Sequence, residues 1–321
     1  MQQPARLQAG RPSRRPLHGV LLLDKPLGLS SNDALQRVKR LLRAQKAGHT
    51  GTLDPLATGV LPLCFGAATK FSGLHLHGSK RYVARMQLGV TTTTGDAEGD
   101  VVQTRDAVAP SPAQWQQVLQ RMTGAIWQKP PMYAALKHQG RPLYAYARAG
   151  QTVQRPLRQI QIDSLRVEPT DDPLQWDLHV QCGAGTYIRV LAEDIGQALG
   201  HGAHLRALRR VATGGFTVEH SITEDQLRER VQQGAPLPWL PTSALLGDAP
   251  KVTLTPEQAG RFLTGARLRL AGPAAEPLAV WGSQPQAFLG MAKRVADELI
   301  ALRLLSPIEI EQTLSQQEIT A

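Results

Sequence analysis

Apolar residues recur along most of the chain at spacings that predict short strands. His18 to Asp24 and Gly59 to Phe65 are continuous apolar runs of the kind found in buried strands. Lys80 to Leu88 alternates, with Tyr82 on the apolar face. Residues 160–167 and 176–182 predict two further strands. We therefore expect a folded core in which several of these strands share a sheet.

Four other stretches have the apolar spacing and the end signals of helices. Ser31 is the expected N-cap of the first, Ser111 opens the second, Thr186 is expected to cap the third and Gly200 to close it, and residues 223–234 form the fourth. The first helix is expected to bury one stripe, made of Ala34, Leu35, Val38, Leu41 and Leu42.

The two ends of the chain differ in pattern from the middle. Residues 1–17 carry four arginines and few apolar side chains, which predicts a disordered basic tail. From about Lys251 onward, short apolar runs are broken by Gly and Pro, and 261–265 is one of these runs. This pattern predicts a small β-rich second domain after a proline-containing linker at 236–241.

Composition narrows the class of partner. The 321 residues are enough for about two domains. Lys and Arg total 36 against 26 Asp and Glu, which gives a formal net charge of +10. A polyanion such as nucleic acid is the natural partner for this charge, although a merely basic soluble protein remains an alternative at this point.

Two cysteines, Cys64 and Cys182, both stand in apolar contexts with no Cys-x-x-Cys spacing. We expect two buried thiols rather than a disulfide framework or a zinc site. The longest apolar run near the N-terminus, Val20 to Leu23, is too short for a signal core or a membrane span. These features predict a cytoplasmic protein that does not enter a membrane.

The densest local signal is the stretch from Gly48 to Gly59, which contains three glycines, one proline, one histidine and one carboxylate. Glycines permit unusual backbone angles, and Pro55 disfavours the helical region for Asp54. The stretch predicts a rigid loop that presents Asp54 beside apolar neighbours, where a carboxylate needs a cationic partner. An ordinary surface turn has the same composition and remains open.

Arg189 is a candidate for that partner, because it falls in the first turn of the third predicted helix. A cation there opposes the helix dipole unless an anion lies close to it.

Residues 129–158 have a different composition from the rest of the chain. Basic side chains alternate with tyrosines there, which is typical of an RNA-contacting surface.

Two motifs give these features a common explanation. Gly48-His-Thr-Gly-Thr-Leu-Asp-Pro-Leu-Ala-Thr-Gly59 and Leu23-Asp-Lys-Pro-Leu-Gly-Leu-Ser-Ser31 resemble the leading motifs of the TruB family of tRNA pseudouridine synthases. Lys80-Arg-Tyr82, Gly185-Thr-Tyr-Ile-Arg189 and the Leu208-Arg-Arg210 segment match later motifs of that family. The resemblance is strong from His18 to about Thr213 and weaker beyond.

The resemblance implies a role for several side chains. Asp54 is then the catalytic residue, Arg189 pairs with it, and Tyr82 stacks on the target base and takes the C5 proton at the end. His49 inserts beside the flipped nucleotide. Tyr187 and Leu208 line the uracil pocket, while Lys25 and Asp96 support the site.

The resemblance also implies an architecture. It predicts an α+β fold whose mixed, largely antiparallel sheet has flanking helices, followed by a small PUA-like domain. The expected parts are a catalytic domain at 18–245, an RNA-gripping insertion at 129–158 and an RNA-binding domain at 250–312. In the insertion, Ala134 stands where the family more often has serine.

The implied substrate is uridine 55 in the T-loop of tRNA. Isomerisation without redox or group transfer needs no cofactor, and the Gly-x-Gly-x-x-Gly, P-loop and His-x3-His patterns are absent from the sequence. We expect no metal, no obligatory protein partner and a monomer bound to the T-stem-loop. A noncatalytic RNA-binding protein and a glycosidase-like hydrolase remain rivals, although a hydrolase usually needs two carboxylates.

Overall fold

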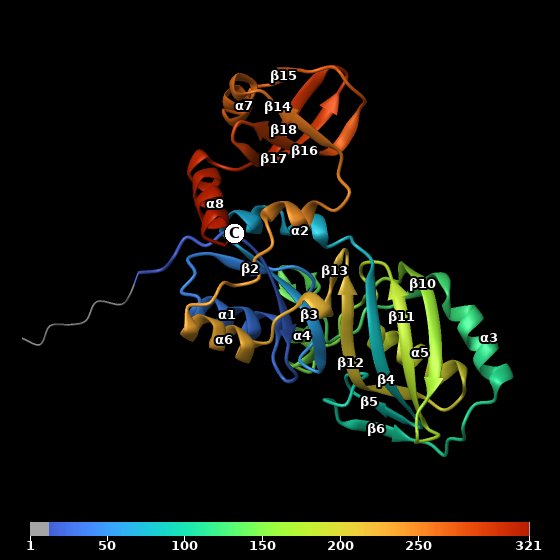
Figure 1. Ribbon diagram of the computed structural model, residues 1–321. Coiled ribbons are helices and arrows are strands. Elements are labelled where there is room, and N and C mark those ends of the chain that lie inside the picture. Colours follow the sequence, from blue (N-terminus) through green and yellow to red (C-terminus); the bar gives the residue numbers. More distant parts are fainter. Residues whose placement is uncertain (1–12, 321) are drawn as a thin grey trace, which may run out of the picture.

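The computed structural model describes residues 13–320, with side chains described through Gln316. Figure 1 shows a larger body built on one twisted sheet and, above it, a smaller β-rich domain at the C-terminal end of the chain. The ten or so residues after Leu240 connect the two parts. The expected two-part α+β architecture is thus confirmed.

Within residues 13–320, nine strands form the large sheet. β12 and β3 are parallel and the other pairs are antiparallel, so the sheet is mixed and largely antiparallel, as expected. In spatial order the main path is β1 (Gly19–Lys25), β3 (Ala57–Phe65), β12 (Ala203–Thr213), β4 (Lys80–Leu88), β11 (Gln175–Cys182), β10 (Arg158–Pro169) and β7 (Gly124–Gln128). β2 (Ala47–His49) joins β3, and β13 (Phe216–Thr217) joins β12.

The long helices pack on this sheet through their apolar stripes. α5 (Ile188–Ala198) lies on β12, and α3 (Pro112–Met122) lies on α5 and β10. Trp115 of α3 meets Trp176 of β11 with ring centroids 4.8 Å apart. α1 (Ser31–Leu41) and α6 (Glu224–Gln233) pack together near β1 and β2. The buried side chains between these elements form one continuous core.

Two helix starts differ from expectation. Ser30, not Ser31, is the N-cap of α1, and its hydroxyl accepts a hydrogen bond from the Asp33 amide. The third helix begins at Ile188 and has no side-chain cap, because the Thr186 hydroxyl donates to the Gly183 carbonyl instead. Ser111 and Thr223 do cap their helices, each within a complete capping box.

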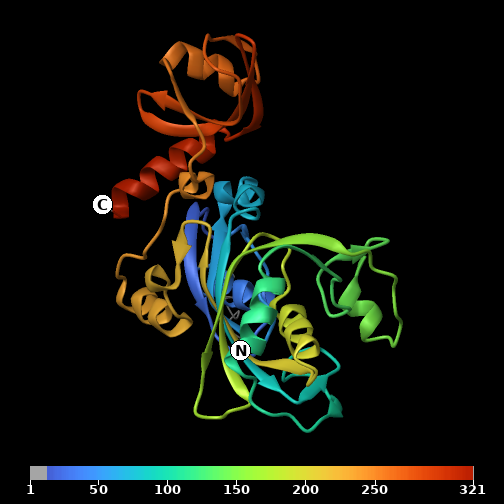
Figure 2. The same cartoon turned by 90° about the vertical axis from the view of Figure 1, so that its right-hand side faces the viewer.

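The insertion at 129–158 contains β8 (Lys137–His138), β9 (Arg141–Pro142) and α4 (Leu143–Ala147). Figure 2 shows this part of the chain, in green, as an arm that extends from the body of the protein. A second hairpin, β5 (Val90–Thr92) with β6 (Val101–Thr104), lies near the C-terminal end of β4. Short helical segments complete the larger body: η1 (Gly66–Lys70), α2 (Ser72–His75), η2 (Val218–His220) and η3 (Thr242–Leu246).

The C-terminal domain is the expected β-rich unit, with strand order β14 (Lys251–Leu254), β16 (Ala275–Ser283), β17 (Gln286–Val295), β18 (Glu298–Leu304) and β15 (Leu268–Arg269). One expectation is wrong there, because the run at 261–265 is not a strand. Thr255 and Gln258 form a capping box that starts α7 (Pro256–Leu263), and Phe262 on that helix is fully buried. Phe262 is the only fully buried side chain on this helix, and one such residue is too weak a signal to predict a helix from the sequence.

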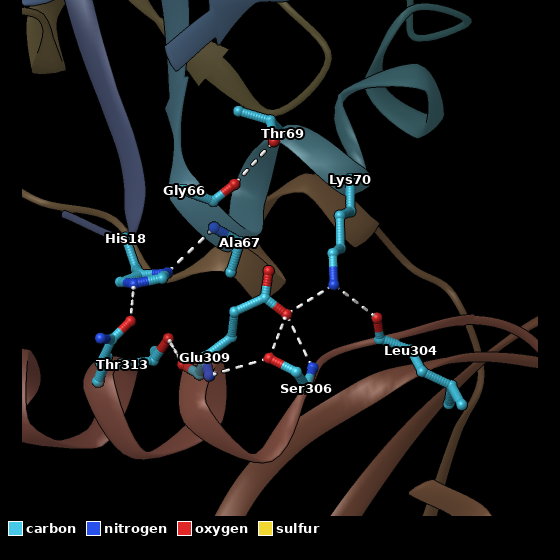
Figure 3. Close-up of polar contacts among 10 residues, drawn as sticks. His18, Gly66, Ala67, Thr69, Lys70, Leu304, Ser306, Glu309 and Thr313 are labelled. Atoms are coloured by element: carbon cyan, nitrogen blue, oxygen red, sulfur yellow. Dashed lines mark hydrogen bonds and ion pairs between the residues drawn. The ribbon is translucent and has the colours of Figure 1, made fainter. Parts of the chain in front are cut away.

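The final helix, α8 (Pro307–Thr320), returns to the larger body. Figure 3 shows Glu309 between the Lys70 ammonium group, 2.6 Å away, and the backbone amide of Ser306. His18 Nδ1 accepts a hydrogen bond from the Ala67 amide, so its protonated Nε2 donates to the Gln312 side chain at 2.9 Å. The last helix therefore fastens the C-terminal domain to β1 and η1.

The start of the described chain is also held in place. Residues 1–12 of the expected basic tail lie outside the described residues. From residue 13 the chain lies against the end of α1, where the Arg15 amide donates to the Arg43 carbonyl and the Arg15 carbonyl accepts from the Gln45 amide. Residues 13–17 are thus tied to the folded body.

Candidate active site

Asp54 lies in a loop that joins β2 to β3 and is tied to the start of α1. The Ser31 hydroxyl accepts a hydrogen bond from the Leu53 amide at 2.7 Å and donates to the Leu53 carbonyl at 3.0 Å. At the ends of the loop, Gly51 (φ 74°) and Gly59 (φ 101°) adopt the left-handed angles that favour glycine. The rigid loop expected from the sequence is therefore present.

Lys25 contacts the turn that packs against this loop. Its side chain is fully buried, and Nζ donates to the carbonyls of Pro26 (2.8 Å) and Leu29 (2.6 Å). Burial lowers the pKa of Lys25 to about 8, although the nearby negative charges of Glu98 and Asp54 act in the opposite direction. Lys25 thus joins the end of β1 to the turn that packs on the Asp54 loop.

Arg189 in the first turn of α5 forms an ion pair with Asp54, with Nη2 to Oδ2 at 2.9 Å. The guanidinium is 4% exposed and uses its other N–H groups on the carbonyls of Thr94 (2.8 Å) and Tyr133 (2.7 Å). Its Nε lies 3.5 Å from Oδ2 of the buried Asp96. Three separate chain segments, at Asp54, at 94–96 and at Tyr133, therefore fix this arginine in one orientation.

The ionisation of Asp54 is set by two opposing effects. Burial raises the pKa of this carboxyl group, and Arg189 lowers it both by its charge and by its hydrogen bond. The negative charge of Asp96 raises the same pKa. Arg189 is thus the main group that favours the charged form of Asp54.

Asp54 and Arg189 lie in a cleft of about 570 Å³. The cleft is bounded by the Asp54 loop, by the strands β4 and β12, by the start of α5 and by the first residues of the 129–158 arm. Tyr82, Tyr187 and Leu208 all line it, as the sequence predicted for the pocket of a flipped base. The volume suits a single nucleobase with its sugar.

Each of these three side chains is placed by its own element. Tyr82 and Leu208 come from the adjacent strands β4 and β12. Tyr187 precedes α5, and its backbone exchanges two hydrogen bonds with the Gln128 side chain, at 2.8 and 3.1 Å. Burial raises the pKa of both tyrosines, so both hydroxyl groups are neutral near pH 7.

The protein matches three family models in sequence order. Residues 39–188 match the N-terminal domain of TruB family pseudouridylate synthases, residues 189–236 match the tRNA pseudouridylate synthase B C-terminal domain, and residues 250–305 match the C-terminal part of TruB pseudouridine synthase II. The chain is 54% identical to a tRNA pseudouridine synthase B of Cupriavidus pinatubonensis over 87% of its own length and 91% of that protein. The chain belongs to the TruB family.

Other comparisons agree with this assignment. A tRNA pseudouridine synthase B of Verminephrobacter eiseniae is 51% identical over 96% of this chain and 94% of its own. Among solved structures, one chain of a Cbf5-Nop10-Gar1 complex superposes with a TM-score of 0.68 at 26% identity, covering 90% of this chain and 84% of that one. As a TruB family pseudouridine synthase, the protein is an isomerase.

Of the expected substrate-binding residues His49, Tyr82, Tyr187 and Leu208, His49 alone does not line this cleft. It ends β2, opposite Leu63, and is not among the residues that line the cleft with Asp54. Its Nδ1 atom is buried without a hydrogen-bond partner in the described part of the chain. Burial and the positive charge of Arg210 lower the pKa of His49. The insertion of His49 beside a flipped nucleotide stays a prediction.

Sequence reasoning missed the role of Arg210 in the TruB scaffold. The resemblance placed Arg210 only within a family motif, whereas β12 lies in the interior of the sheet and Arg210 is 1% exposed. Its place beside Tyr82 follows from strand pairing, which the sequence alone did not specify.

Two acidic side chains near the TruB ion pair were also missed. Burial raises the pKa of Glu193 and of Glu98, and both carboxyl groups interact with the charges of Arg189 and Asp96. Within residues 13–320, no three His, Cys, Asp or Glu side chains are grouped so that they could hold a metal ion. The absence of a cofactor from the reaction stays a prediction.

Two further expectations concern single features. Cys64 and Cys182 are buried free thiols, as expected, and burial raises their pKa values to about 12 and about 11. Among the described helices, none has the length and apolar character needed to cross a membrane.

Proposed function

We propose that this protein converts uridine 55 in the T-loop of tRNA to pseudouridine. The observation that carries the proposal is the Asp54–Arg189 ion pair, which lies in a cleft lined by Tyr82, Tyr187 and Leu208. Each of these residues stands at a matching position in a TruB motif. The tRNA substrate is supported by the names of the relatives, which are tRNA pseudouridine synthases B.

The target base must leave its stack to reach a carboxylate at the bottom of this cleft. Unstacking one base costs on the order of a few kcal/mol, and a pocket with apolar and aromatic walls offsets this cost. Tyr82 and Tyr187 offer ring surfaces, and Leu208 offers an aliphatic one. The flipped uracil then lies within reach of the Asp54 carboxylate.

Asp54 acts in its ionised form. It starts cleavage of the glycosidic bond either by attack on carbon or by removal of a ribose proton, and Arg189 stabilises the carboxylate charge before that step. The uracil rotates within the closed pocket and rejoins the sugar through C5. Tyr82 is the base for the C5 proton that must then leave.

The arm at 129–158 and the C-terminal domain hold the tRNA. Lys129 and Lys137 on the arm are exposed, and Tyr133 and Ala134 at its base lie beside Arg189 and the cleft. Basic side chains on the arm would contact phosphates of the T-stem, and recognition would depend on the shape of the stem-loop. We infer that one monomer suffices for this grip.

The test uses the full chain and an unmodified tRNA transcript labelled at the T-loop uridine, with neither metal nor cofactor added. Wild-type protein is expected to form pseudouridine, and Asp54→Asn is expected to bind the same transcript without forming product. Tight binding without product from wild type would point to a noncatalytic RNA-binding protein. Release of free uracil would show a hydrolase.

A further inference from the structure

Arg210 is a buried arginine that reaches two parts of the active site from β12. Its strand neighbours are Gly59 of β3 on one side and Tyr82 of β4 on the other. Its Nε donates to the Val60 carbonyl at 2.9 Å, and its Nη2 donates to the Gly51 carbonyl at 2.9 Å. One side chain thus connects the loop that carries Asp54 to the strand that carries Tyr82.

Two glycines make room for this arginine. A Cβ atom on Gly59 would collide with the Arg210 backbone, and a Cβ atom on Gly51 would lie 3.1 Å from Nη1 of the guanidinium. Both glycines also have positive φ angles. The glycines that bound the Asp54 loop therefore serve the approach of Arg210 as well as the shape of the loop.

The guanidinium has an unusual electrostatic position. Among residues 13–320, no carboxylate forms an ion pair with Arg210, although burial of a cation without a counter-charge is unfavourable. Its partner across the β4–β12 pairing is Tyr82, and both side chains line the same cleft. Arginine carries only donors, so it interacts favourably with the phenol oxygen and leaves the phenol proton free for the cleft.

The closeness of Arg210 affects how readily the Tyr82 hydroxyl ionises. Burial raises the pKa of the Tyr82 hydroxyl, and the charge of Arg210 lowers it. Asp54 lies on the same cleft and its negative charge raises that pKa. Arg210 is thus the group that favours negative charge on the phenol oxygen within the cleft.

We propose that Arg210 is a positioning residue for the isomerisation, which fixes the Tyr82 oxygen and the Asp54 loop relative to each other for removal of the C5 proton. This proposal rests on the proposed function. In the step concerned, the Tyr82 phenol oxygen takes the proton from C5 while the phenol's own proton passes to water. The C5–H electron pair becomes the C5=C6 double bond, the N1=C6 pair returns to N1, and N1 takes a proton from water. Tyr82 is therefore a neutral phenol before and after the step.

The test compares Arg210→Met and Arg210→Lys in the wild-type background and in a Tyr82→Phe background. The substrate is a tRNA transcript with either hydrogen or deuterium at C5 of the T-loop uridine. Arg210→Met is expected to lower kcat by about 10- to 100-fold with a nearly unchanged KM. It is also expected to increase the isotope effect, since loss of the C5 proton becomes slower. Arg210→Lys keeps a cation and is expected to recover part of the loss.

The Tyr82→Phe background separates positioning from a merely structural role. If Arg210 acts through Tyr82, adding Arg210→Met to Tyr82→Phe lowers kcat by less than about threefold more. An equal fold-loss in both backgrounds, with no change of isotope effect, would overturn the proposal. If Arg210→Met does not fold by circular dichroism, the same comparison made with Arg210→Lys decides it.

The outcome for the proposed function is read separately. Pseudouridine formation that depends on Asp54 but shows no coupling between Arg210 and Tyr82 would reject only the role of Arg210. Absence of pseudouridine with the wild-type protein would overturn both proposals together.

Discussion

Arg189 Nη2 lies 2.9 Å from Asp54 Oδ2, so the start of α5 and a loop before β3 meet through one ion pair. A lone cation in the first turn of a helix is disfavoured by the helix dipole, whereas an anion there is favoured. The Asp54 carboxylate therefore gains from the arginine and from the end of α5 alike. The pair also depends on the pairing of β12 with β3, because Asp54 precedes β3 and α5 packs on β12.

The pH dependence of activity should report this pair. Asp54 works ionised, so activity is lost as the pH falls through its pKa, which burial holds above the ordinary value. Arg189 lowers that pKa, and its removal raises it further. Arg189→Met is therefore expected to lower the rate. It is also expected to move the acidic limb of the pH profile of kcat/KM to higher pH. Arg189→Lys, which keeps the charge, is the control, and an acidic limb at the same pH in all three proteins would contradict this account.

Lys25 gives a prediction for stability at alkaline pH. Its pKa is about 8 in the folded protein and near 10.5 when unfolded, so between these values the unfolded chain binds more protons. The free energy of unfolding from this group should therefore rise as the pH increases from about 8 toward 10.5. Urea unfolding at a series of pH values should show this rise in wild type and in Lys129→Met, but not in Lys25→Met. A parallel pH dependence in all three would refute it.

The arm at 129–158 should contribute electrostatic affinity for tRNA. Lys129 and Lys137 are exposed there, and each phosphate contact that is lost should reduce the slope of log K against log salt by about 0.7 to 0.9. The double variant Lys129→Gln/Lys137→Gln is expected to bind more weakly at low salt with a shallower slope. Arg121→Gln on α3, also an exposed basic residue, is the control and should leave the slope unchanged. An equal slope in the arm variant would remove the arm from the tRNA interface.

The Lys70–Glu309 pair should couple the C-terminal domain to the catalytic domain. Both side chains are mostly buried, and Nζ to Oε2 is 2.6 Å. A double-mutant cycle with Lys70→Met and Glu309→Gln is expected to give a coupling of about 1 kcal/mol or less in the free energy of unfolding, as for partly exposed pairs. Arg267 and Glu298, an ion pair on the surface of the C-terminal domain, provide the matched cycle and should couple more weakly. An equal coupling energy in the two cycles would show that the ion pair of α8 stabilises the protein no more than a surface ion pair does.

The sequence was most informative where a residue type has a direct local effect on backbone conformation or charge. Gly51, Gly59 and Pro55 indicated the rigid loop, and the position of Arg189 in a first helical turn indicated a nearby anion. The family motifs then supplied Asp54, Tyr82, Tyr187 and Leu208, which the structure brings to one cleft. Their catalytic and binding roles stay predictions.

The sequence was least informative where the meaning of a residue depends on which strands pair. The sequence placed Arg210 in a family motif, but its burial follows from the position of β12 between β3 and β4. His49 pairs with Leu63 at the end of β2 and does not line the cleft, and its insertion beside the flipped nucleotide stays a prediction. The α8 helix was missed because its apolar residues are few. It is held to the larger body by polar contacts with residues far away along the chain. Such long-range pairing leaves no local pattern to read.

The return of α8 to β1 bears on how the protein matures on the ribosome. The backbone N–H and C=O of His18 both bond to the Gln316 side chain, and its ring bonds to Gln312, 294 residues further along. At typical rates of synthesis, His18 emerges about 15 to 60 seconds before those partners exist. The segment that leads into β1 at His18 thus lacks these hydrogen bonds until α8 is made. Nascent chains stalled before α8 should therefore be more open to protease at residues 13–18 than the released protein.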